Sequence, residues 1–238
     1  MIKQENMLFL VKNLTKTYGS GDAVVNALRG VNVEIPAKEL IVLLGPSGSG
    51  KSTLLNILGG LDRPTSGSVY FKNENLSTMS EADLTRYRRQ NIGFIFQQYN
   101  LIPSLTALEN VELVTEISDD PMDAKQALEM VGLAARVEHF PSQMSGGELQ
   151  RVAIARAIAK QPSVLFCDEP TGALDSKTGR TILNILQDIN QNLGTTIIIV
   201  THAMATAAMA DRIIYFSDGN INKININQQK SAADDIEW

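Results

Sequence analysis

The sequence predicts an α/β fold in which a mostly parallel sheet is covered by helices on both faces. Four short apolar runs lack the polar alternation of a half-exposed strand, which is typical of strands buried on both faces. Each run also ends at a polar residue or a glycine turn. Because ligands bind at the carboxyl ends of the strands in open α/β sheets, one edge of the sheet is expected to hold a site. The runs cover residues 40–44, 92–96, 164–167 and 197–200.

The composition fits a folded protein of this class. The chain has 238 residues, of which 44% are hydrophobic and 20% are charged, a globular profile that suits one large domain or one domain with an inserted lobe. Its net charge of −5 argues against nucleic acid as a partner, since such proteins usually carry a basic face. The single cysteine, Cys167, excludes an intrachain disulfide and a zinc cage, and its apolar surroundings favour a packed side chain over a reactive thiol.

No apolar run approaches the roughly 20 residues that span a bilayer, and the apolar stretch near the N-terminus is too short for a signal peptide. Any action at a membrane therefore requires a membrane part from another chain.

We expect one domain over 1–238 with three regions. Short β-type runs open the chain at 8–11 and 31–35. Helical signals follow, with helix starts at 80–84 and 106–109 and a short helix over 123–131. The predicted regions are a core over about 1–97 and 160–221, a helical lobe over about 98–160, and a peripheral tail over about 222–238, with a strand at 220 where this last stretch begins.

Residues 45–53 match the pattern G-x-x-x-x-G-K-[ST], between an apolar run and the helix-like stretch 54–58, as this phosphate-binding motif requires. Its glycines let successive N–H groups point inward, and the helix N-terminus adds partial positive charge. Lys51 is expected to reach the β- and γ-phosphates, Ser52 to hold Mg²⁺ and Thr53 to add a phosphate contact. The alternative is a glycine–serine turn that precedes a lysine by chance. The apolar run before the loop and the helix-like stretch after it disfavour this alternative. The predicted nucleotide-binding residues are Gly45, Pro46, Ser47, Gly48, Ser49, Gly50, Lys51, Ser52 and Thr53.

Two carboxylates, Asp168 and Glu169, end the run 164–167. In phosphoryl-transfer sites a carboxylate at such a strand end supports Mg²⁺, the role that we assign to Asp168. Glu169 lies one residue further and points elsewhere, so it is expected to polarise the water that attacks the γ-phosphate. An isolated Asp-Glu pair would more often be an exposed turn, but the nearby phosphate loop favours the functional interpretation.

A second helix start carries paired glycines. Ser145 and Glu148 have the spacing of a capping box. Gly146 and Gly147 leave the helix N-terminus bare, so that its N–H groups can face an anion. A purely structural cap explains the serine and the glutamate but not the two glycines.

With these motifs the chain resembles the ABC ATPase family, which is a branch of the P-loop NTPases. The signature of the ABC ATPases is typically LSGGQ, and this chain has Met144 in place of Leu and Glu148 in place of Gln. The resemblance covers about residues 8–221. It implies a fold with a small N-terminal antiparallel β part and the inserted helical lobe. It also implies a head-to-tail homodimer in which the phosphate loop of one copy and Ser145 of the other enclose each ATP. The nucleotide-binding residues expected from the signature are Ser145, Gly146, Gly147 and Glu148.

Further positions acquire roles through this resemblance alone. Tyr18 matches the aromatic residue that stacks on adenine, and Gln97 matches the glutamine that senses the metal and the attacking water. Asp175 matches the loop that lines the dimer seam, and His202 matches the histidine that contacts the γ-phosphate. Catalysis is thus expected from Glu169, His202, Lys51 and Gln97, and Mg²⁺ binding from Ser52, Gln97 and Asp168.

Residues 92–111 and 168–176 are similar to the branch that serves macrolide export, lipoprotein release and antimicrobial-peptide resistance. The implied protein is an ATPase at the cytoplasmic face of the membrane, bound to a separate permease. A soluble ABC ATPase in DNA maintenance or on the ribosome is a second hypothesis, disfavoured by the acidic charge and by the lack of coiled coils or a second ATPase domain. A third is a regulator that binds ATP without hydrolysis, which the intact Asp168, Glu169 and His202 disfavour.

Overall fold

The computed structural model describes residues 6–236, so the first five and last two residues of the predicted domain lie outside it. A six-stranded sheet forms the centre, in the order β10-β9-β3-β8-β7-β6. The neighbours from β9 to β6 are parallel, and only β10 is antiparallel, which confirms the mostly parallel sheet. Its strands are β3 (Leu40–Leu44), β6 (Ile92–Ile95), β7 (Val164–Asp168), β8 (Thr196–Thr201), β9 (Arg212–Ser217) and β10 (Asn220–Ile226).

Strand β3 shows why these runs lack alternation. Leu40, Val42 and Leu44 belong to one buried cluster, whereas Ile41 and Leu43 belong to another. Because successive side chains point to opposite faces of a sheet, an entirely apolar strand has a hydrophobic layer on each side.

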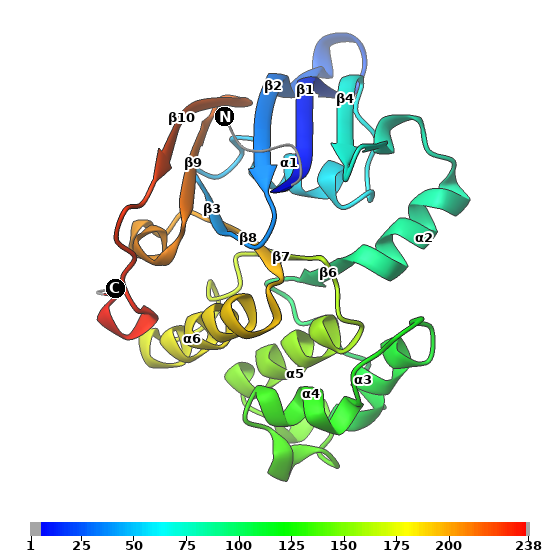
Figure 1. Cartoon of the computed structure of the whole chain (residues 1–238), viewed down its shortest axis with the longest axis vertical. Helices are drawn as coiled ribbons and strands as arrows, with labels where there is room; N and C mark the ends of the chain where they lie inside the picture. The colour runs from blue at the N-terminus through cyan, green and yellow to red at the C-terminus, as the bar shows by residue number, and fades with distance from the viewer. Residues whose placement is uncertain (1–5, 237–238) are drawn as a thin grey trace.

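On one side of the central sheet lies a four-stranded antiparallel sheet, in the order β2-β1-β4-β5. It is seen beside β3 and β9 in Figure 1. The helix α1 (Lys51–Leu58) buries Leu54 and Leu55 in the cluster that both sheets share. This bears out the antiparallel N-terminal part. Its strands are β1 (Met7–Tyr18), β2 (Val25–Pro36), β4 (Ser66–Phe71) and β5 (Glu74–Asn75).

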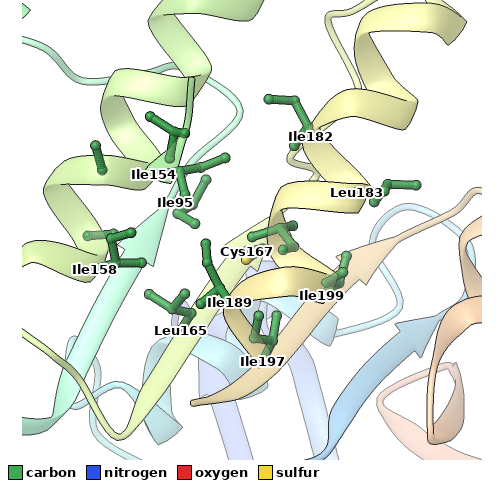
Figure 2. Close-up of a cluster of buried hydrophobic side chains, with 14 of the residues drawn as sticks. Ile95, Ile154, Ile158, Leu165, Cys167, Ile182, Leu183, Ile189, Ile197 and Ile199 are labelled. Atoms are coloured by element: carbon green, nitrogen blue, oxygen red, sulfur yellow. The ribbon is translucent and has the colours of Figure 1, made fainter. Parts of the chain in front are cut away.

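On the other side lie α5 (Gly146–Ala159) and α6 (Ser176–Leu193), with α3 (Ala107–Thr115) and α4 (Ala124–Met130) beyond α5 (Figure 1). Figure 2 shows Ile154 and Ile158 of α5 and Ile182 of α6 above the strands. The predicted helix starts are present, since Thr106 forms a capping box and Asp123 caps α4. Ser80 likewise caps α2 (Glu81–Asn91).

The C-terminal segment lies on the outside of the fold, and most of its residues from 222 to 235 are exposed. Strand β10 continues to Ile226, and a 3-10 turn (Ala233–Asp235) follows. Ala233 and Ile236 are 0% and 3% exposed, and Arg180 Nε on α6 donates to the Ile236 carbonyl at 3.1 Å. The segment thus contacts α6 through Ala233 and Ile236, while most of its other residues stay exposed.

Candidate functional site

A cavity of about 910 Å³ opens at the carboxyl ends of β3, β7 and β8. Most of the predicted phosphate, metal and catalytic residues meet there, although they come from separate parts of the chain. The predicted residues that line it are Tyr18, Ser47, Gly48, Ser49, Gly50, Lys51, Ser52, Thr53, Gln97, Asp168, Glu169 and His202.

The phosphate loop joins β3 to α1. Gly50 caps the helix with a left-handed backbone, φ 104°, and a Cβ there would collide with the carbonyl oxygen of Ala27. No side chain caps α1, and its first turn contains no acidic residue. Its first N–H groups are therefore available to an anion.

Lys51 is folded back onto its own loop. Its Nζ donates to the carbonyls of Gly45 and Pro46, each at 2.8 Å, and its side chain is buried. Burial lowers the pKa of Lys51, against the opposing effect of Glu169 and Asp168. Gly45 and Pro46 thus face Lys51 and do not line the cavity, which refines their predicted place in the site.

Asp168 and Glu169 face different partners. The Ser52 hydroxyl donates to Asp168 Oδ1 at 3.1 Å, and burial raises the pKa of Asp168 despite that bond. Oxygen donors at a strand end suit Mg²⁺, a hard cation that is commonly bound by few protein groups. The residues therefore fit the predicted metal.

Glu169 is held at the end of β8. Its Oε1 lies 2.9 Å from His202 Nδ1, and the Thr201 hydroxyl donates to its Oε2 at 3.2 Å. Its backbone has a positive φ of 49°, which is uncommon for a residue with a side chain. The carboxylates of Glu169 and Asp168 thus contact different partners.

Several residues of the site have no role in the sequence prediction. Thr201 immediately precedes His202 at the same strand end, so its position was a usable signal. Val24 and Val25 line the cavity beside Tyr18 and are 46% and 60% exposed. No motif marks these two residues, because a surface valine pair is unremarkable in sequence.

Ser145 does not join this cavity. The Glu148 N–H donates to Ser145 Oγ at 3.3 Å, and the Ser145 N–H donates to Glu148 Oε2 at 2.8 Å, which confirms the capping box. Arg136 Nε lies 3.2 Å from Glu148 Oε1 and balances its charge. Asp175, the expected seam residue, caps α6 by accepting from the Thr178 N–H at 3.0 Å.

The paired glycines have packing reasons that the sequence analysis missed. Gly147 is buried, and a Cβ there would collide with Thr178 Cγ2 of α6. A Cβ at Gly146 would lie 2.9 Å from the Tyr99 hydroxyl. Close approach of neighbouring side chains therefore favours glycine at both positions, in addition to the exposure of the helix end.

Gly147→Ala is expected to lower the free energy of unfolding by about 1–3 kcal/mol, the usual cost of overpacking. Urea denaturation measures it. Thr178→Ser in the same chain removes Cγ2 but keeps the hydroxyl that bonds Asp175, so most of the loss should be recovered. Equal stability of Gly147→Ala and wild type, or no recovery in the double variant, would disprove this packing account.

Comparison with known proteins gives consistent matches to one family. A family model described as ABC transporter matches residues 28–172. The uncharacterised ABC transporter ATP-binding protein MJ0796 of Methanocaldococcus jannaschii is 48% identical over 222 residues, which is 90% of this chain and 94% of that protein. The macrolide export ATP-binding/permease protein MacB of Hyphomonas neptunium is 44% identical over 232 residues, or 95% of this chain and 36% of that protein.

A solved structure has the same fold. It is the dimeric, post-hydrolysis state of the ATP-binding cassette MJ0796 bound to ADP and Pi, with a TM-score of 0.85 and 44% identity, covering 93% of this chain and 100% of that one. Among residues 6–236, no helix combines the length and apolarity that crossing a membrane requires.

Proposed function

Because this chain belongs to the ABC transporter family and is an ATP-binding, ATP-hydrolysing subunit, we propose that two copies close around ATP and drive a separate membrane permease. The separation of the two anion-binding helix ends within one chain carries this proposal. The phosphate loop at α1 lines the cavity, whereas Ser145 at α5 does not. An ATP bound at Lys51 can meet a signature serine only if a second copy supplies it. The dimeric form of MJ0796 supports this arrangement.

The residues of the cavity divide the work of hydrolysis. Ser52 and Asp168 would hold Mg²⁺, with Gln97 beside them, and the ion would neutralise phosphate charge. Glu169 would accept a proton from the attacking water, since His202 and Thr201 fix its carboxylate. In this proposal, Lys51 moves from its loop carbonyls to the phosphates and His202 contacts the γ-phosphate.

The helical lobe is positioned to relay the state of the cavity. Gln97 lines the cavity, and the segment after it is tied to α5. Arg156 of α5 donates to the carbonyls of Tyr99 and Asn100 at 3.0 and 2.6 Å. The helix that begins after Ser145 therefore holds the segment that follows Gln97. Closure of the dimer would move both together, as in other ligand-biased two-state elements.

We assign the permease to the branch of macrolide export, lipoprotein release or antimicrobial-peptide resistance. Support comes from the similarity to MacB, whose name combines ATP-binding and permease functions in one longer protein. Here the permease would be a separate chain, and this subunit would lie at the cytoplasmic face through contact with it.

Co-expression with the membrane protein encoded by a neighbouring gene tests this proposal. The two chains are expected to purify together after detergent extraction, and the permease is expected to change the rate of phosphate release. If this chain purifies alone and its hydrolysis is unaffected by the membrane protein, the assignment of that partner is wrong.

A further inference from the structure

Tyr18 is held from two sides in the structure. Its hydroxyl donates to Asp62 Oδ2 at 2.6 Å, and Lys16 Nζ lies 4.7 Å from the centroid of its ring. Burial, followed by the bond to Asp62, raises the pKa of the Tyr18 hydroxyl, so it remains a neutral donor at physiological pH. With 41% of Tyr18 still exposed toward the cavity, the ring is fixed but not covered.

Lys16 and Asp62 are themselves fixed. Lys16 Nζ donates to Asp62 Oδ1 at 2.6 Å and to the Arg63 carbonyl at 2.7 Å, and its side chain is only 13% exposed. The Arg63 N–H also donates to Asp62 Oδ1 at 2.7 Å. Partial burial would raise the pKa of Asp62, but its three donors together hold that pKa below the ordinary value. The carboxylate thus stays charged and connects the ammonium to the phenol.

This group of Lys16, Asp62 and Tyr18, which we name the tyrosine clamp, is anchored to the phosphate-binding helix. Asp62 follows α1 in the chain, and its N–H donates to the carbonyl of Asn56 on that helix at 3.3 Å. The same helix begins at the phosphate loop. The position of the Tyr18 ring is therefore set relative to the element that receives the phosphates.

We propose that Lys16 and Asp62 are positioning residues that set the Tyr18 ring for the adenine base. The proposal rests on the adenine-stacking role assigned to Tyr18. The ammonium lies over one face of the ring, which leaves the other for the base. Because an aromatic side chain that is already ordered loses little rotamer freedom on binding, the tyrosine clamp favours ATP by preorganisation.

The alternative is that the tyrosine clamp only ties β1 to the segment after α1 and stabilises the fold. The two explanations predict different affinities for a ligand that has phosphates but no base. A positioning role weakens the binding of ATP alone, whereas damage to the fold would also disturb the phosphate loop and weaken inorganic tripolyphosphate.

The test compares Asp62→Ala with wild type by calorimetric titration of ATP and of inorganic tripolyphosphate. The Kd of ATP is expected to rise about three- to tenfold, the scale of ordering one or two side chains, while that of tripolyphosphate stays within about twofold. In steady-state hydrolysis the KM for ATP should rise and kcat should not change. Equal weakening of both ligands, or no change for ATP, overturns the proposal.

Three further variants make the result decisive. Glu81→Ala breaks an exposed ion pair with Arg63 in the same region without touching the tyrosine clamp, and should leave both Kd values unchanged. Asp62→Asn provides the same comparison if the alanine variant fails to fold. Tyr18→Ala separates the two ideas. If Tyr18→Ala leaves the ratio of the Kd of ATP to the Kd of tripolyphosphate unchanged, the adenine role of Tyr18 itself is wrong. If it raises that ratio while Asp62→Ala does not, only the tyrosine clamp is wrong.

Discussion

Replacing Glu169 with Gln is expected to slow ATP hydrolysis by about a thousandfold, within the range ascribed to general bases, and to leave ATP binding intact. The amide is isosteric with the carboxylate but cannot take the proton of the attacking water. His202 and Thr201 can still contact it, so the geometry of the cavity is retained. Closed dimers with bound ATP should therefore accumulate.

Phosphate release and size-exclusion chromatography with ATP and Mg²⁺ measure the two effects. Glu34→Gln is a matched control, because Glu34 is exposed on β2 and does not line the cavity. Turnover by Glu169→Gln at the wild-type rate would remove Glu169 from the proposed chemistry. Slow turnover without dimer accumulation would contradict its place in a shared site.

Lys51→Ala is expected to raise the Kd of ATP by at least about a hundredfold, since hydrogen bonds to charged groups contribute about 1.5–3 kcal/mol each and Lys51 is assigned two phosphates. The ammonium holds the carbonyls of Gly45 and Pro46 in the free protein, and these two contacts are exchanged for the phosphates on binding, so the loss is a net value.

Calorimetric titration with ATP measures this loss. Lys125→Ala, on the exposed side of α4, removes an equal charge far from the phosphate loop and should bind as wild type does. Circular dichroism checks that both variants are folded. An affinity within a few-fold of wild type for Lys51→Ala would contradict the assigned contact with the phosphates.

Much of the architecture was predictable, because its signals are local. The strands β3, β6, β7 and β8 read as uninterrupted apolar runs, and their ends gave the edge where the cavity lies. Helix α6 was missed although local signals exist. Asp175 caps it, Gly194 ends it in a left-handed conformation, and Ile182, Leu186 and Ile189 are spaced for a single buried face.

The remaining features depend on contacts between distant residues. Asp62 and Tyr18 are 44 positions apart, and nothing in either segment indicates that they meet. The contact that limits Gly147 likewise comes from Thr178 on another helix. The contact of Ala233 and Ile236 with α6 also depends on the face of that helix that they meet. Spacing along the chain does not encode these contacts, which arise only when distant segments pack together.

The central claim is that each ATP is enclosed by Lys51 of one copy and Ser145 of the other, and mixing two defective variants tests it most directly. Lys51→Ala and Ser145→Ala, each in a Glu169→Gln background and labelled with different fluorophores, should scarcely dimerise alone with ATP. Mixed together they should pair, because a heterodimer contains one intact shared site. If the mixture pairs no better than either variant alone, or if either variant alone pairs like its Glu169→Gln parent, ATP is not held between two copies in this way.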